Sequence, residues 1–279
     1  MTKKQTNNLL YHNMLNRFVF KDFNAVDYNL FFTICYFAVK SKKGVEISLS
    51  FEELRDFLPQ EKNKKRFYDN VVKFAIKLNS LKTTDAYFDD EGYRNFSISS
   101  FFEEICVKEK EERIYFKIKE KSLFLIYDVF ANYTKIDIKD FCSIGNKYAK
   151  NLYRLLKQWE STGEFIIPFN EFNLIMGIPD SYNLEKIENK VIKPSIILLS
   201  GNKKENDKIY FKDLNYQKIK EKGSGNIGRG GQVKEFVFYF DVPEERKEII
   251  EMKKWGRRIS KKAVPPPPNK RDLIQEISF

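Results

Sequence analysis

An internal repeat constrains the fold of this chain more than any other feature of its sequence. The segment Phe51-Glu-Glu-Leu-Arg-Asp-Phe-Leu-Pro59 is echoed 118 positions later (169 − 51) by Phe169-Asn-Glu-Phe-Asn-Leu-Ile-Met-Gly-Ile-Pro179. Each copy follows an apolar-periodic segment and a short β-like run, and each precedes a basic helical segment and strand patterns. This is the order of elements in a winged helix. The sequence therefore predicts an α+β fold of two tandem winged-helix domains, each a helix-turn-helix with a β-wing.

Chain length agrees with this division, because 279 residues favour about two domains. We expect an N-terminal winged helix over residues 9–131, a linker over 132–144 and a C-terminal winged helix over 145–255. The linker lacks sustained periodicity, and a strand is the alternative there. The remaining residues, 256–279, form a basic, proline-rich tail with a polyproline II spacer at Pro265–Pro268. This tail is either a phosphate-binding arm or a disordered extension.

Periodicity in the N-terminal half predicts three helices followed by strands. The first helix, about Ala25–Lys40, has one apolar face, and the second begins at a capping box over Ser50–Glu53 and ends at Pro59. The third helix, about Asn63–Leu81, buries Phe67, Val71, Phe74 or Ala75, and Leu78. We expect strands at Ala86–Phe88, Asn95–Phe101 and Arg113–Ile118, and a short helix at Ser122–Phe130.

The C-terminal half repeats this order. A helix over Asn146–Glu160 precedes a strand at Phe165, a helix at Asn170 and a helix over Leu184–Leu199, which Pro194 bends near its end. The apolar face of the first of these helices is Tyr148, Leu152, Leu155, Leu156 and Trp159. Two strands, Lys208–Phe211 and Glu235–Asp241, flank a basic, glycine-rich loop, and a last helix covers Glu244–Trp255.

Charge and composition narrow the class of partner. The chain has 50 Lys and Arg against 39 Asp and Glu, a formal net charge of +11, which indicates a polyanion such as nucleic acid or an acidic membrane surface. Lysine used only for solubility is the alternative. Against a membrane, the longest apolar stretch, Leu30–Val39, is about half of the roughly 20 residues that a bilayer requires. Three widely spaced cysteines and a polar N-terminus suit a cytoplasmic protein.

The residues that carry enzyme chemistry are scarce. The chain has one histidine, His12, so it lacks the two clustered histidines with which an origin-nicking enzyme holds its metal ion. A catalytic centre built on His12 would lie in an N-terminal arm that we expect to be mobile. The motif Gly223-Ser-Gly225-Asn-Ile-Gly228 precedes a strand instead of the helix that a dinucleotide site requires, and no P-loop occurs. We therefore expect a non-enzymatic protein without a metal or other cofactor.

The helix over Leu184–Leu199 is the sharpest candidate for a DNA contact. If Leu184, Ile187, Val191 and Ile196 face inward, four polar side chains emerge on the opposite side: Lys186, Asn189, Lys190 and Lys193. Lysine can hold a phosphate or a guanine edge, and asparagine can pair with adenine. Glu185 and Glu188 could accept a hydrogen bond from cytosine. An ordinary solvated helical face is the alternative.

Two further basic clusters are candidates for phosphate contacts. The loop between the last two strands reads as a wing that enters a minor groove, with Lys218, Lys220, Lys222, Arg229 and Lys234, or else as a disordered loop with incidental lysines. In the N-terminal half, the charge gathers at the start of the third helix, which suits contacts to the DNA backbone: Lys62, Lys64, Lys65 and Arg66.

The C-terminal half resembles the replication initiator (Rep) family of theta-replicating bacterial plasmids. The residues that carry the resemblance lie in Gly145–Trp159, Phe169–Gly177, Ile178–Tyr182 and Val191–Ile196, and it is clearest over residues 143–197. A looser likeness extends across residues 28–242 and leaves out the tail.

The resemblance implies that the second winged helix reads repeated sites, or iterons, at a plasmid origin in double-stranded DNA. The family's recognition helix falls on Leu184–Ile196, and the first winged helix takes part in dimerisation and DNA contact. The resemblance also implies monomers that bind the repeats, homodimers that repress the protein's own gene, and recruitment of host helicase or initiator proteins. Two alternatives remain: a tandem winged-helix transcriptional repressor, and an origin-nicking enzyme.

Overall fold

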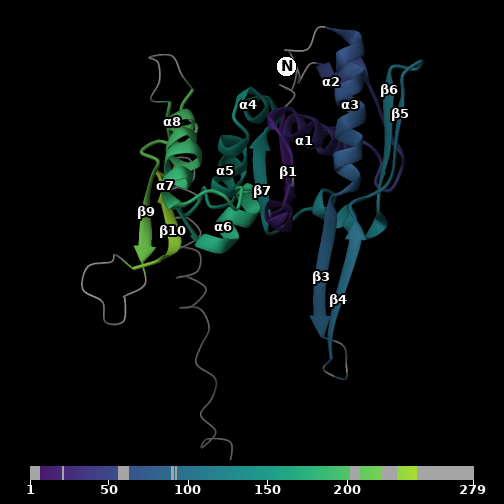
Figure 1. Cartoon of the computed structure of the whole chain (residues 1–279). Helices are drawn as coiled ribbons and strands as arrows, with labels where there is room; N and C mark the ends of the chain where they lie inside the picture. Colours follow the sequence, from purple (N-terminus) through teal and green to yellow (C-terminus); the bar gives the residue numbers. More distant parts are fainter. Residues whose placement is uncertain are drawn as a thin grey trace, which may run out of the picture. The chain divides into compact units, whose positions relative to one another are not determined.

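The computed structural model describes residues 7–20, 22–55, 63–88, 91, 93–201, 208–220 and 231–243 (Figure 1). Every helix and strand given below lies in one compact unit, residues 1–241. Several predicted features lie outside the described residues: Pro59, Lys62, the Gly223–Gly228 motif, Lys222, Arg229, the helix over 244–255 and the tail.

The N-terminal half forms the predicted winged helix. Helix α1 (Ala25–Lys40) precedes strand β2 (Ile47–Ser50), helix α2 (Phe51–Arg55) and helix α3 (Lys64–Asn79), and the wing follows as β5 (Phe102–Lys108) and β6 (Arg113–Ile118). These strands form an antiparallel sheet in the order β2-β6-β5. The predicted capping box is present, because the Glu53 backbone N–H donates to Ser50 Oγ at 3.1 Å and the Ser50 backbone N–H donates to Glu53 Oε2 at 2.8 Å.

The C-terminal half repeats this arrangement with its own elements. Helix α5 (Lys147–Gln158) precedes β8 (Glu164–Pro168) and α6 (Phe169–Met176), then come a helix in three parts and the wing strands β9 (Asn215–Lys220) and β10 (Val233–Tyr239). The sheet order is β8-β10-β9, so in both halves the short strand pairs with the last strand of the wing. Phe51 and Phe169 each begin a helix directly after that short strand. The internal repeat and the tandem winged-helix fold are therefore confirmed.

Additional elements join the two halves. Strand β1 (Asn8–His12) pairs with β7 (Tyr133–Asp137), and helix α4 (Ile138–Ser143) follows. The segment 132–144, predicted as a linker, is therefore folded, and the strand left open as an alternative is present. His12, predicted to lie in a mobile arm, ends β1. A 3-10 helix, η1 (Asn13–Arg17), follows β1, and β3 (Lys82–Phe88) and β4 (Arg94–Ser100) form an antiparallel hairpin.

Two other predictions were wrong. Residues 208–211 are not a strand: the backbone N–H groups of Tyr210 and Phe211 both donate to the Leu199 carbonyl, and the ring of Phe211 packs on Tyr153 and Phe240. Phe211 is buried in the core and Ile209 is exposed, and the wing strand is β9. The helix predicted at Ser122–Phe130 is a shorter 3-10 helix, η2 (Glu120–Leu125).

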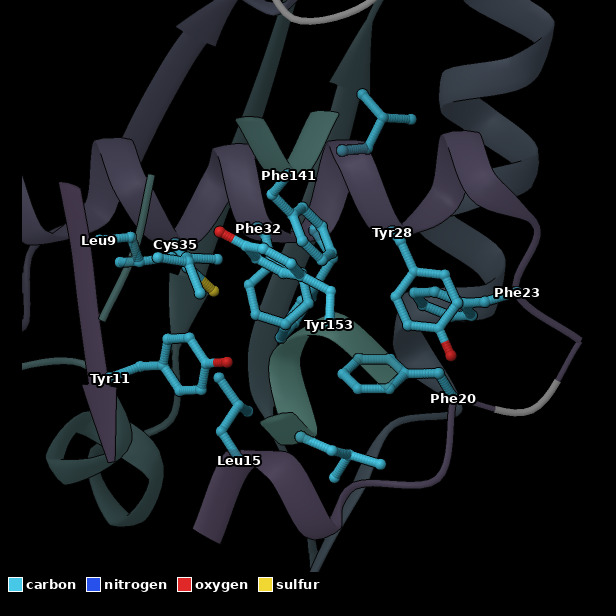
Figure 2. Close-up of a cluster of buried hydrophobic side chains, with 14 of the residues drawn as sticks. Leu9, Tyr11, Leu15, Phe20, Phe23, Tyr28, Phe32, Cys35, Phe141 and Tyr153 are labelled. Carbon is cyan, nitrogen blue, oxygen red and sulfur yellow. The ribbon is translucent and has the colours of Figure 1, made fainter. Parts of the chain in front are cut away.

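A continuous aromatic core runs between the two winged helices (Figure 2). Phe32 of α1 contacts Tyr11 of β1 at 5.5 Å and Phe141 of α4 at 4.7 Å, and Phe141 in turn contacts Tyr153 of α5 at 6.0 Å between ring centroids. Helix α1 is consequently buried on most of its surface, not on one face as predicted; even Asn29 and Thr33 are covered. None of the described helices is long and apolar enough to cross a bilayer.

Two basic side chains of α5 are fully buried in this junction. Lys150 Nζ donates to the carbonyls of Phe141, at 2.5 Å, and Cys142, at 3.3 Å, at the end of α4. The guanidinium of Arg154 donates to the carbonyls of Leu15, at 3.0 Å, and Phe18, at 3.2 Å, at the end of η1. The last carbonyls of a helix lack partners within it and attract cations. The N–H donors of these two side chains therefore fasten α5 to α4 and to η1.

Candidate nucleic-acid interface

The helix predicted to read DNA is present and contains a π-helical turn. It consists of α7 (Leu184–Ile187), the π turn η3 (Glu188–Ile192) and α8 (Lys193–Ser200). The side chain of Asn183 caps its N-terminus by accepting the Lys186 backbone N–H at 3.0 Å. Pro194 has no N–H to donate to the Lys190 carbonyl, and the backbone N–H of Lys193 donates to Glu188, five residues back. The helix therefore widens into a π turn directly before the proline, near the predicted bend.

The two faces of this helix are divided as predicted. Ile187 and Val191 are fully buried, and Leu184 and Ile196 are partly buried. Ile192 is also fully buried, which the predicted face did not include. The four predicted contact residues are all exposed: Lys186, Asn189, Lys190 and Lys193. Their exposure is confirmed, while their contact with DNA stays a prediction.

Neighbouring side chains hold two of these lysines in place. Lys193 Nζ donates to Asn189 Oδ1 at 2.9 Å, and Lys190 Nζ lies 5.5 Å from the centroid of the Tyr182 ring. Among the described residues, no carboxylate pairs with Lys186, Lys190 or Lys193. Their positive charge is therefore available to an anion. Tyr182 is a residue that the sequence did not single out for this surface.

The carboxylate of Glu188, a candidate acceptor for cytosine, is engaged by the wing in this structure. Its carboxylate accepts a hydrogen bond from the Tyr216 hydroxyl at 2.5 Å and pairs with Lys218 Nζ at 2.7 Å, so it faces the wing strand β9. Burial opposes ionisation of Glu188, but the hydrogen bonds from Lys218 and Tyr216 outweigh burial and lower the pKa of the carboxyl. Glu188 and Lys218, both candidates for DNA contact, are thus engaged with each other. Glu185 on the same helix is exposed.

The wing presents its other described lysines to solvent. Lys220 at the end of β9 and Lys234 in β10 are exposed, and the pairing of these strands shifts by one residue between Val233 and Glu235. Figure 1 shows β9 and β10 beside α7 and α8, as the contact between Tyr216 and Glu188 requires. The helix α7–α8 and the wing strands therefore lie side by side, each with exposed lysines.

The basic cluster of the N-terminal half lies at the start of α3. Lys64, Lys65 and Arg66 are exposed in its first turn, and the Asn63 side chain caps this turn by accepting the Arg66 backbone N–H at 3.0 Å. Lys64 pairs with Glu112 at 3.0 Å across an exposed surface. Exposed pairs of this kind exchange readily with solvent or another anion. The position of the cluster fits contacts to a phosphate backbone.

The surroundings of His12 give it a structural role. Its Nδ1 accepts the Met14 backbone N–H at 3.3 Å, and its ring contacts Phe124 at 5.6 Å. In the part of the chain that the structure describes, no three His, Cys, Asp or Glu side chains are grouped so that they could hold a metal ion.

Comparison with known proteins identifies the family. A family model described as initiator replication protein, WH1, matches residues 8–157, more than half of the chain. The protein belongs to the initiator replication protein family. The match continues through β7 and α4 and into α5, past the end predicted for the first winged helix at residue 131. The division into domains therefore stays a proposal.

Relatives of this initiator-family chain include a curated protein and two solved structures. It is 25% identical over 191 residues to the probable replication protein rep of Bifidobacterium longum (strain NCC 2705), an alignment that covers 67% of this chain and 62% of the relative. The Pi initiator protein, solved in complex with iteron DNA, aligns with a TM-score of 0.62 at 13% identity over 87% of this chain and 100% of Pi. Domains 2 and 3 of RctB align with a TM-score of 0.51 at 10% identity, over 78% and 82% of the two chains. At these identities the solved structures establish the fold alone.

Proposed function

We propose that this initiator-family protein binds iterons at a plasmid origin as a sequence-specific, non-enzymatic initiator of replication. The observation that carries the proposal is the exposed face of the recognition helix. Three lysines without a described carboxylate partner lie beside one asparagine, next to a basic wing. The fold is that of an initiator solved on iteron DNA.

The chemistry of this face suits the major groove. The groove admits an α-helix, and the N-terminal part of a recognition helix contacts base edges. Asn189 can form two hydrogen bonds with adenine, while Lys186, Lys190 and Lys193 can reach guanine edges or phosphates. Lys220 and Lys234 of the wing would contact the DNA phosphate backbone. In the N-terminal half the same contacts would come from Lys64, Lys65 and Arg66.

Other features of the proposal come from the family. We infer a homodimer in equilibrium with a monomer, in which the N-terminal winged helix contributes to dimerisation and the dimer represses the protein's own gene. DNA-bound monomers would strain nearby AT-rich DNA and recruit host replication proteins such as a helicase in the bacterial cytoplasm. Plasmid copy number after deletion of the gene distinguishes an initiator from a repressor. Supercoiled origin DNA incubated with protein and Mg²⁺ stays unnicked on this account.

Exchange of two recognition-helix lysines tests the site. We expect Lys190→Ala with Lys193→Ala to weaken iteron binding by about 1–3 kcal/mol for each base contact that is lost. The measurement is a titration of iteron duplex, with Lys135→Ala and Lys139→Ala as the control, because both lysines are exposed on β7 and α4. A double variant that binds as tightly as the unchanged protein would remove this helix from the site.

A further inference from the structure

We propose that Glu188 and Lys218 are positioning residues that set the specificity of DNA binding. Their ion pair fixes the wing strand β9 against the recognition helix and withholds the charge of Lys218 from DNA phosphates. The inference rests on the proposed function and assigns Lys218 a role other than the phosphate contact expected from its place in a basic loop.

The Glu188 carboxylate joins the recognition helix to the wing strand β9. Glu188 begins the π turn of the recognition helix, and its carboxylate lies 2.5 Å from the Tyr216 hydroxyl and 2.7 Å from Lys218 Nζ. Tyr216 is held in the wing, since its ring contacts Phe236 at 6.3 Å and Phe238 at 6.1 Å between centroids. The carboxylate therefore connects two elements: the helix that would read bases and the strand that leads into the wing.

Burial of Glu188 keeps Lys218 paired with it. The side chain of Glu188 is 15% exposed, so its carboxylate is largely shielded from solvent, whereas the side chain of Lys218 is 32% exposed. If Lys218 turned to a phosphate, the shielded carboxylate of Glu188 would lose its counter-ion, which is costly. Lys218 is thus retained by Glu188, unlike Lys186, Lys190 and Lys193, which have no carboxylate partner among the described residues. A phosphate would gain this lysine only by breaking its ion pair with Glu188.

This arrangement limits binding to unrelated sequences. Non-specific affinity depends on the number of phosphates that a protein neutralises, and each contributes about 0.9 to the slope of log K against log salt. Specific affinity depends instead on base contacts made by a correctly placed helix and wing. Keeping Lys218 paired with Glu188 therefore reduces non-specific binding and preserves specific binding.

The substitution Glu188→Gln tests the inference. Glutamine keeps the size of the side chain and an acceptor for Tyr216 but releases Lys218. We expect binding to a scrambled duplex to tighten by about tenfold at 0.1 M salt, the salt slope to steepen by about 1, and discrimination between iteron and scrambled duplex to fall.

A charge-matched variant separates this effect from the loss of a negative charge. Glu164→Gln removes the same charge from an exposed site on β8, the edge strand of the same sheet opposite β9, and we expect it to leave the salt slope unchanged because it releases no lysine. Adding Lys218→Gln to Glu188→Gln should return the slope to its starting value. If Glu188→Gln and Glu164→Gln have equal slopes, the inference is wrong.

Lys218→Gln alone gives a second, independent result. We expect it to leave the slope on scrambled duplex unchanged, since Lys218 contacts no phosphate in the unchanged protein; a slope lower by about 1 would overturn the inference. The unchanged protein separates this failure from failure of the proposed function. If it does not distinguish iteron from scrambled duplex, the proposed function fails; if it does and the variants behave alike, only the inference fails.

Discussion

Replacing Arg154 with methionine is expected to lower the free energy of unfolding by about 3 kcal/mol. The guanidinium is fully buried and donates to the carbonyls of Leu15 and Phe18 and to Asn151 Oδ1. Methionine donates to none of these, and a buried acceptor without a donor costs about 1–3 kcal/mol. Burial disfavours the charged form and lowers the pKa of Arg154. Removing this buried charge is favourable and therefore offsets part of the cost of the unpaired acceptors.

The matched control is Arg113→Met. Arg113 donates to Ser48 Oγ at 2.6 Å and to the Ser48 carbonyl at 3.3 Å on the partly exposed strand β6, where water can replace it. We expect this control to lose less than about 1 kcal/mol. Thermal unfolding measures both variants, and about 3 kcal/mol corresponds to a fall of about 6–12 °C for a unit of this size. If Arg154→Met unfolds at the temperature of its control, the buried guanidinium does not fasten α5 to η1.

The second large effect is a dependence of stability on pH that comes from Lys150. Burial lowers the pKa of Lys150 from its ordinary 10.5 to about 7. In the unfolded chain the amine keeps its ordinary pKa. Between pH 7 and about 10.5 the unfolded chain therefore binds a proton that the folded protein does not. The free energy of unfolding contributed by this group rises with pH across that window, and below pH 7 the folded protein bears the full cost of the buried charge.

Lys150→Met removes this pH-dependent contribution, which is then obtained as the difference in stability between the variant and the unchanged protein. We expect the stability of the variant relative to the unchanged protein to be highest near pH 6 and to fall by on the order of 4 kcal/mol by about pH 10.5. Chemical denaturation at a series of pH values measures the difference, with Lys139→Met, an exposed lysine of α4, as the control. Parallel pH profiles for Lys150→Met and the unchanged protein would contradict the assignment.

The sequence predicted the elements whose signals are local. A capping box at Ser50, an apolar face through Ile187 and Val191, and the repeated strand-to-helix start at Phe51 and Phe169 all depend on neighbours a few residues away. For the same reason, the exposure of Lys186, Asn189, Lys190 and Lys193 followed from helical periodicity alone.

The features that escaped prediction depend on partners far along the chain. Strand β7 is recognisable only because β1 lies about 125 residues earlier and pairs with it (His12 with Tyr133, Asn8 with Asp137). The burial of Arg154 in an amphipathic helix depends on the carbonyls of Leu15 and Phe18, which lie at the end of η1 in the N-terminal half. The sequence suggested Glu188 as an acceptor for cytosine, because no neighbouring residue indicates that Tyr216 and Lys218 of β9 contact its carboxylate.

The α7–α8 helix of the second winged helix is proposed to read repeated DNA sites, and a footprint on the DNA that flanks the gene tests this proposal. We expect the unchanged protein to protect regularly spaced repeats about two helical turns apart, and the Lys190→Ala, Lys193→Ala variant to lose this protection while it remains folded. Absence of regular protection, or the same protection by the variant, would contradict the claim.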